Sequence, residues 1–309
     1  MPGSTGPLTI TRMPDMYDAI IVGGSYAGQS AALQLARARR NILVMDEGVR
    51  RNRFAADSHG FLGQDGRDPS AIAADARQQL LAYPNVTWLA ERAESAERLD
   101  DSFAVADKSG TRHEARTVVL ATGIRDGLPN IPGLAERWGR AVFHCPYCHG
   151  YELNQGRIGV LAVSEISMHH ALMLPDWGTT TFFVNGAFEP SADQLAQLAA
   201  RGVTVERGQI RALEGDPIDV VLEDGRRVAL DGLFTATATE VSSPIASQLG
   251  CDFADGPTGR YIRIDGMQAT SVPGVFACGD AARAAGNVAL AVGDGAMAGA
   301  ATHRKLMFG

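Results

Sequence analysis

Short apolar runs, each followed by small or turn-forming residues, recur along the chain and predict buried strands. Residues 19–22 (AIIV) and 42–45 (ILVM) are continuous apolar runs of strand length. Runs of this kind are typical of parallel strands that are covered on both faces. Between them, residues 30–36 (SAALQLA) have helical composition. The order strand, tight turn, helix, strand predicts a βαβ unit and a parallel sheet.

The same order of elements returns in the second half of the chain. Residues 103–123 and 218–237 each contain a hairpin with a Gly turn, followed by a strand that ends in small residues. Residues 158–163 predict an opening strand for the second copy, as residues 19–22 do for the first. The pattern therefore predicts two related nucleotide-binding folds.

Composition and charge fit a two-domain enzyme. The chain has 309 residues, of which 45% are hydrophobic, and a net charge of -7. This charge argues against nucleic acid or an anionic membrane as the main partner. No apolar stretch reaches the roughly 20 residues of a membrane-spanning helix. Four cysteines and no export signal indicate a reducing cytoplasm. Residues 1–15 are expected to form a disordered leader.

Two cysteines with two residues between them, Cys145 and Cys148, lie between His144 and His149. This spacing places both sulfurs on one turn at a predicted helix start, where a thiol pKa is lowered and a disulfide can open and close. The four side chains are also possible zinc ligands. The string CPYCH further matches the c-type haem attachment pattern. A redox dithiol is the favoured interpretation, and the other two stay open.

The turn after residues 19–22 matches a dinucleotide-binding fingerprint. Gly23 and Gly28 occupy the first and third glycine positions, and Ser25 takes the middle one. Such turns let a pyrophosphate approach the backbone and rest on a helix N-terminus. Asp46 ends the next apolar run, 18 residues after Gly28, close to the spacing expected for the acid that binds a ribose hydroxyl.

Together with residues 121–123 (ATG) and 270–280 (TSVPGVFACGD), these motifs resemble the pyridine-nucleotide-disulfide oxidoreductase family, in its low-molecular-weight thioredoxin-reductase branch. The resemblance covers nearly the whole chain after the leader. It implies an α/β fold of two Rossmann-like three-layer (ββα) domains, the second inserted into the first, and a homodimer. Residues 16–128 and 241–309 would form the FAD-binding domain, and residues 129–240 the inserted NAD(P)-binding-like domain that carries the cysteines.

The resemblance also implies roles for individual residues. Cys148 would exchange electrons with the flavin, and Cys145 with a substrate. Familiar thioredoxin reductases have an aspartate after the second cysteine. Here His149 stands in that place and would move the proton, with His144 as a second candidate. The implied FAD contacts are Gly23, Gly24, Ser25, Tyr26, Ala27, Asp46, Glu47, Asn52, His59, Ala93, Ala121, Thr122, Gly123, Gly279, Asp280, Asn287, Val288 and Ala289.

The inserted domain departs from the family pattern. The turn after residues 158–163 has no glycine and carries Glu165, and residues 185–189, after the next predicted strand, contain no Lys or Arg. A working NADPH site needs a Gly-rich turn and cations for the 2′-phosphate. NADPH binding is therefore expected to be weak or absent.

Residues 144–152 (HCPYCHGYE), with further features near residues 46–48, 51–52 and 65–66, are similar to the branch that closes disulfides in gliotoxin-type and holomycin-type metabolites. The expected function is a cytoplasmic FAD-dependent dithiol/disulfide oxidoreductase that oxidises a small-molecule or protein dithiol with oxygen. An NADPH-dependent thioredoxin reductase is the alternative. A non-catalytic flavin redox sensor or zinc-binding protein is the alternative of another class. His169 and His170 are expected at the surface or the edge of the core.

Overall fold

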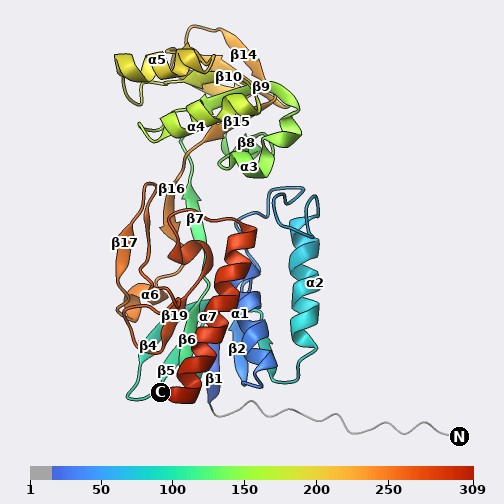
Figure 1. Ribbon diagram of the computed structural model, residues 1–309, viewed down its shortest axis with the longest axis vertical. Coiled ribbons are helices and arrows are strands. Elements are labelled where there is room, and N and C mark those ends of the chain that lie inside the picture. Colours follow the sequence, from blue (N-terminus) through green and yellow to red (C-terminus); the bar gives the residue numbers. More distant parts are fainter. Residues whose placement is uncertain (1–15) are drawn as a thin grey trace, which may run out of the picture.

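A computed structural model describes residues 16–309 of the chain. The predicted leader at residues 1–15 lies outside the described residues. The protein has two lobes, one above the other, which two strands connect (Figure 1). The lower lobe contains both the N-terminal and the C-terminal segments, and the upper lobe contains the middle of the chain.

The sheet of the lower lobe has seven strands, in the order β3-β2-β1-β6-β5-β4, with β19 paired to β6. The β1, β2, β3, β6 and β19 strands are parallel, whereas β4 and β5 form an antiparallel hairpin beside β6. The strands are β1 (Tyr17–Val22), β2 (Ile42–Met45), β3 (Val86–Leu89), β4 (Ala93–Arg98), β5 (Phe103–Asp107), β6 (Arg112–Leu120) and β19 (Val275–Ala277).

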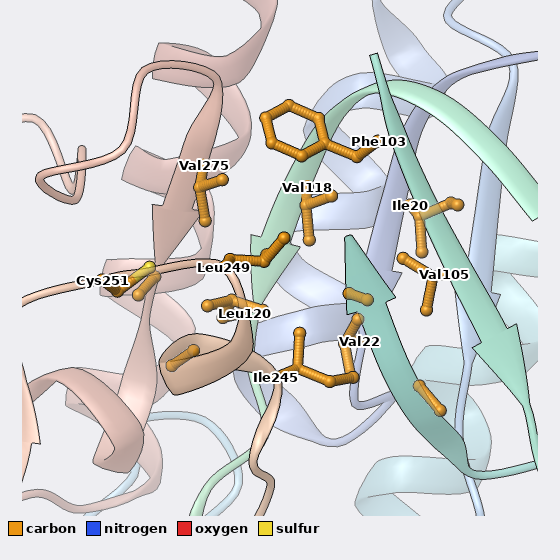
Figure 2. Packing of buried hydrophobic residues seen from close by; sticks show 14 of the residues in the cluster. Ile20, Val22, Phe103, Val105, Val118, Leu120, Ile245, Leu249, Cys251 and Val275 are labelled. Carbon is orange, nitrogen blue, oxygen red and sulfur yellow. The ribbon is translucent and has the colours of Figure 1, made fainter. Parts of the chain in front are cut away.

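Side chains on β1 alternate between two cores. Ala19 and Ile21 pack with the helices α1 (Tyr26–Arg37) and α7 (Val288–Phe308). Ile20 and Val22 point to the opposite face, where they meet the β4–β5 hairpin and Ile245 of α6 (Ile245–Gln248) (Figure 2). Fully burying one such aliphatic side chain contributes about 1.5–3 kcal/mol. This arrangement, hairpin on sheet on helices, confirms the predicted three-layer α/β fold.

Close packing of α7 on α1 sets the place of both helix starts. A Cβ on Gly295 would lie 2.1 Å from the carbonyl oxygen of Ala27, and one on Gly299 would lie 2.5 Å from that of Ala31. Glycine at these positions lets the two backbones touch. Because the contacts advance in the same direction along both helices, α1 and α7 are parallel and begin at the same edge of the sheet. The helix α2 (Pro69–Leu81) lies beside α1.

The upper lobe repeats this plan, which confirms the second predicted copy. A parallel sheet has the order β11-β10-β9-β15-β8. Helices α4 and α5 pack on one face, and a three-stranded meander packs on the other. The elements are β8 (Val142–Phe143), β9 (Gln155–Leu161), α4 (Ser167–Met173), β10 (Gly178–Phe183), α5 (Ala192–Ala200), β11 (Thr204–Glu206), β12 (Ile210–Glu214), β13 (Ile218–Leu222), β14 (Arg227–Leu230) and β15 (Gly232–Thr235).

The strands β7 (Ile124–Gly127) and β16 (Ala238–Val241) connect the lobes and pair with each other antiparallel. The predicted domain boundaries at 128 and 240 fall near the ends of these strands, and the division itself stays a prediction. Across residues 16–309, no helix is both long and apolar enough to span a membrane. The remaining elements are β17 (Phe253–Asp255), β18 (Arg260–Ile262), the one-turn helix α3 (Pro146–His149) and the 3-10 helices η1 (Ala135–Arg137), η2 (Tyr151–Leu153), η3 (Leu174–Asp176) and η4 (Gly279–Ala282).

Candidate functional site

Most of the predicted cofactor segments meet at the carboxyl edge of the lower sheet. Val22 lies beside Met45 and Leu120 in the strand register, and Ala277 also lies beside Leu120. The loops that follow these four strand ends are therefore neighbours, as is usual for ligand sites on parallel sheets. They are residues 23–28, 46–47, 121–123 and 278–280.

The turn after β1 has no room for side chains at its glycines. Gly23 has φ +100°, and a Cβ there would lie 2.3 Å from the carbonyl oxygen of Ala121. A Cβ on Gly28 would lie 1.8 Å from the carbonyl oxygen of Gly23. The fingerprint does not require glycine at position 24, yet a Cβ on Gly24 would lie 2.4 Å from the Trp88 side chain. The N–H of Gly24 donates to Asp46 Oδ1 at 3.1 Å. The turn is thus held tightly against two neighbouring strand ends.

Two helices begin at this edge. Ser25 is the N-cap of α1, but its side chain makes no capping hydrogen bond within the described structure, so first-turn amides of α1 are left for another acceptor. Asn287 caps α7 by accepting from the N–H of Leu290 at 2.8 Å, so Val288 and Ala289 form its first turn. Asp280 lies in η4, directly after Gly279, where an added Cβ would lie 2.8 Å from the Cβ of Ala27 in α1 and 3.7 Å from that of Ala291 in α7.

The other predicted cofactor contacts are placed less uniformly. Asn52 donates to the hydroxyl of Tyr26 at 3.1 Å, which brings both residues to the start of α1. Glu47 is exposed, whereas Ala93 is buried at the start of β4 within the hydrophobic core. His59 contacts Glu152 of the upper lobe, with 3.4 Å between Nε2 and Oε1.

Cys145 and Cys148 form a disulfide, with 5.3 Å between their Cα atoms. Cys145 is the N-cap of α3, as the spacing predicts, but α3 has only four residues. A helix of one turn has a small dipole, so the predicted lowering of a thiol pKa by the helix start has little support here. The remaining cysteines, Cys251 and Cys278, are buried and unpaired.

The two histidines beside the disulfide are held against aromatic rings. His144 stacks on Trp138 at 5.9 Å between ring centroids, and His149 stacks on Phe143 at 4.3 Å. Burial, followed by the charge of Arg51, lowers the pKa of His144 to about 3. Burial, followed by the charge of His59, lowers the pKa of His149 to about 4. Both imidazoles are therefore neutral at pH 7 and able to accept a proton.

His170 joins this group, although the sequence predicts it at the surface or the core edge. His169 is exposed, but His170 is half-buried, interacts with the main chain of His144, and has a pKa lowered to about 4, mainly by burial. Its Nδ1 atom is buried and has no hydrogen-bond partner within residues 16–309. The available signal was its position on the same face of α4 as buried Ser167 and Ala171.

Arg51 links segments that are distant in the sequence, and it was not among the predicted site residues. Its Nε and Nη2 atoms donate to the two carboxylate oxygens of Asp126 in β7, at 2.8 and 2.7 Å. Its Nη1 atom donates to Asp280 at 3.1 Å. The hydroxyl of Thr237 also donates to Asp126, at 2.7 Å. Burial alone would raise the pKa of Asp126, but its bonds to Arg51 outweigh burial and lower it.

The corresponding edge of the upper sheet differs. After β9, the N–H of Val163 is bonded to Ser167 Oγ at 3.0 Å, and Glu165 is exposed. Two arginines of this lobe lie beside carboxylates. Arg207, which follows β11, pairs with Glu189 at 2.5 Å, and Arg226, in the β13–β14 turn, pairs with Glu206 at 2.6 Å and with Asp224 at 2.7 Å. Both arginines are exposed, and each already has a carboxylate partner in this structure.

A model of the family described as pyridine nucleotide-disulphide oxidoreductase matches residues 17–295. The chain belongs to this family. "Thioredoxin reductase tcpT" of Claviceps purpurea (strain 20.1) is 33% identical to this chain, in an alignment of 309 positions that covers 95% of each chain. A solved oxidoreductase from Agrobacterium tumefaciens is 58% identical, with a TM-score of 0.93 over 95% of this chain and 99% of that one. The structure of HlmI is 35% identical, with a TM-score of 0.89 over 96% and 94%.

These relatives confirm the resemblance to the thioredoxin-reductase branch and show an oxidoreductase that acts on thiol and disulfide groups. The family implies FAD, and the lower edge fits it. Thr122 has a buried hydroxyl without a partner in the described chain, and the first amides of α1 have no capping side chain. Residues 23–28 would hold the pyrophosphate, and Thr122 and Asp280 would face the ribityl and flavin portion. These individual roles stay predictions.

Proposed function

We propose that this protein oxidises a dithiol to a disulfide and passes the electrons through Cys145 and Cys148 to FAD and then to oxygen. The observation that carries this direction is the contrast between the two sheet edges. The lower edge fits a dinucleotide, whereas the upper edge lacks a glycine turn and has its arginines paired with carboxylates. Electrons from NADPH would have to enter through the upper edge.

The exchange at the cysteine pair balances in two steps. One substrate thiolate attacks Cys145 Sγ, the Cys145–Cys148 bond breaks, and Cys148 leaves as a thiolate. The second substrate thiolate then attacks the substrate sulfur of the mixed disulfide, and Cys145 leaves. The substrate thus loses two electrons and two protons, and the cysteine pair gains the two electrons. Bound FAD supplies the two-electron acceptor for the pair, and oxygen, reduced to hydrogen peroxide, takes the electrons onward.

Neutral imidazoles suit this direction because each substrate thiol must lose a proton before it attacks. His149 directly follows Cys148 and is neutral at pH 7, with a pKa near 4. His144 precedes Cys145, and its still lower pKa makes it the weaker base of the two. We therefore assign His149 as the principal base and His144 as the second.

Exposed apolar side chains lie around the cysteine pair and support a small, apolar dithiol as substrate. Tyr147, between the cysteines, is 73% exposed and lies edge-on to Trp177. Tyr151 is 84% exposed, and Leu62, in the loop that contacts Glu152 through His59, is 97% exposed. Exposed apolar groups of this size commonly mark a binding surface.

An oxygen electrode tests this function. We expect the holoenzyme to consume one oxygen molecule per dithiothreitol oxidised, with no nicotinamide nucleotide present. Strict dependence of thiol and disulfide turnover on NADPH would instead support the alternative, an NADPH-dependent thioredoxin-disulfide reductase. That alternative is favoured by the printed names of relatives such as tcpT.

We further infer that the protein is a cytoplasmic homodimer. The cytoplasm is supported by the two buried free thiols, which a reducing compartment preserves. The dimer is supported by the family resemblance, and sedimentation of the holoenzyme tests it. The net charge of -7 supports small-molecule partners over nucleic acid.

A further inference from the structure

We propose that Arg51 is a positioning residue that holds the inserted domain docked on the FAD domain, with the disulfide facing the flavin cleft. This inference rests on the proposed function, because it assigns the working orientation of the same site. The geometry that carries it is a set of contacts from one short loop, residues 51–59, to the connecting strands and to both sides of the cysteine pair.

The first contact is at the connection between the lobes. Arg51 donates hydrogen bonds to both carboxylate oxygens of Asp126, which lies in β7, the strand that leads into the upper lobe. Thr237, just before the returning strand β16, donates to the same carboxylate. One carboxylate therefore fixes both connecting segments. The Asp126 side chain is only 6% exposed, and such a bidentate, desolvated pair is stronger than a surface ion pair.

The second and third contacts flank the disulfide. Phe54 packs against Gly139, which precedes Cys145 in the chain. A Cβ added to Gly139 would lie 2.7 Å from the Cβ of Phe54. His59 Nε2 lies 3.4 Å from Glu152 Oε1, beyond Cys148. The 51–59 loop therefore touches the upper lobe on both sides of the redox pair as well as at its connection.

Rotation of the upper lobe about β7 and β16 would break the contacts of Phe54 with Gly139 and of His59 with Glu152, which lie away from the connecting strands. Arg51 fixes the connecting strands themselves through Asp126, so it sets the orientation from which such a rotation would start. A reaction that needs only a dithiol and a flavin requires a single orientation of the upper lobe. A reaction in which a nicotinamide and the disulfide approach the flavin alternately would require a second orientation. The 51–59 loop thus favours a single docked orientation.

Arg50 provides a matched control within the same loop region. Its Nη2 atom donates to the hydroxyl of Ser70 in α2 at 2.8 Å, so its side-chain bond stays within the lower lobe. Arg50→Gln and Arg51→Gln remove the same charge one residue apart. Only the second removes the bond to the connecting strand.

Hydrogen exchange of the FAD-loaded enzyme tests the proposal. We expect Arg51→Gln to raise exchange about tenfold or more in peptides that cover β7, β16 and residues 144–153. Arg50→Gln should leave these peptides at the wild-type rate. Arg51→Lys should fall between them, since an ammonium cannot form the two-pronged bond. Exchange in Arg51→Gln equal to wild type would overturn the proposal.

A second variant separates docking from flavin binding, because Arg51 also contacts Asp280. Thr237→Val removes a hydrogen bond to Asp126 without touching Asp280. It should raise exchange in the same peptides by a smaller factor, with FAD content unchanged. Unchanged exchange in Thr237→Val would contradict the shared role of Asp126. If wild-type flavin accepts no electrons from dithiothreitol, the proposed function fails while the exchange result still stands.

Discussion

The two sheet edges of this molecule have the same architecture and different chemistry. At the lower edge, a glycine turn presses against Ala121, and the first amides of α1 have no capping side chain. At the upper edge, the equivalent turn closes on itself through Ser167, and Arg207 and Arg226 bind carboxylates. A duplicated fold therefore does not carry a duplicated ligand site, because the site depends on a few turn residues and on free charges.

The largest expected effect concerns the route of the electrons. Cys148→Ser should abolish reduction of the bound flavin by dithiothreitol, by about 10³-fold or more, because serine cannot form the disulfide. Anaerobic stopped-flow absorbance of the flavin measures this rate. Cys251→Ser is the control, since Cys251 is bonded to the hydroxyl of Thr270 and a serine can keep that bond. Flavin reduction at wild-type rate in Cys148→Ser would contradict the role of the cysteine pair.

The second effect tests the lower edge alone. Gly28→Ala should prevent tight FAD binding, because the added methyl would lie 1.8 Å from the carbonyl oxygen of Gly23 and would force the turn open. The flavin-to-protein absorbance ratio after purification measures this loss. Gly293→Ala in α7, where a Cβ meets nothing within 4 Å, should retain FAD and slightly stabilise the helix. Full FAD content in Gly28→Ala would show that the turn is not the pyrophosphate site.

The third effect concerns His149, the proposed base. His149→Gln should slow flavin reduction by a dithiol about 10²-fold at pH 7, since the amide cannot take up the thiol proton. The same stopped-flow measurement applies. Because the pKa of His149 is about 4, the wild-type rate should show no loss from protonation of this residue between pH 6 and 8. A fall in rate centred near pH 6.5 would mean that His149 is solvated and unshifted.

Sequence reasoning captured what is local and missed what is distant. The strands and the glycine positions of the first turn follow from periodicity and turn chemistry within a few residues. The Arg51 contacts could not be predicted, because Asp126 and Asp280 lie 75 and 229 residues away. His170 is half-buried, as expected of a residue at the core edge, but its closeness to His144 could not be predicted from a separation of 26 residues. The one-turn length of α3 depends on packing rather than on the Cys145–Cys148 spacing.

The smallest effect is on stability against pH. The pKa values of His144, His149 and His170 are lowered in the folded protein to about 3, 4 and 4. In the unfolded chain these imidazoles bind protons below about pH 6.5. Their contribution to the free energy of unfolding is therefore full above that pH and falls as the pH drops toward 4, by at most about 1.4 kcal/mol per histidine per pH unit.

Urea unfolding at pH 7.5, 6 and 5 measures this slope. His170→Gln should reduce it, because one fewer imidazole takes up a proton on unfolding. An equal slope in His170→Gln and wild type would contradict the lowered pKa of His170.

The most direct test of the account is an anaerobic titration of the flavin spectrum. Excess NADPH or NADH should leave the visible absorption band of the oxidised flavin essentially unchanged. One equivalent or more of a dithiol should bleach it. Rapid bleaching by NADPH would contradict the claim that only the lower edge binds a dinucleotide.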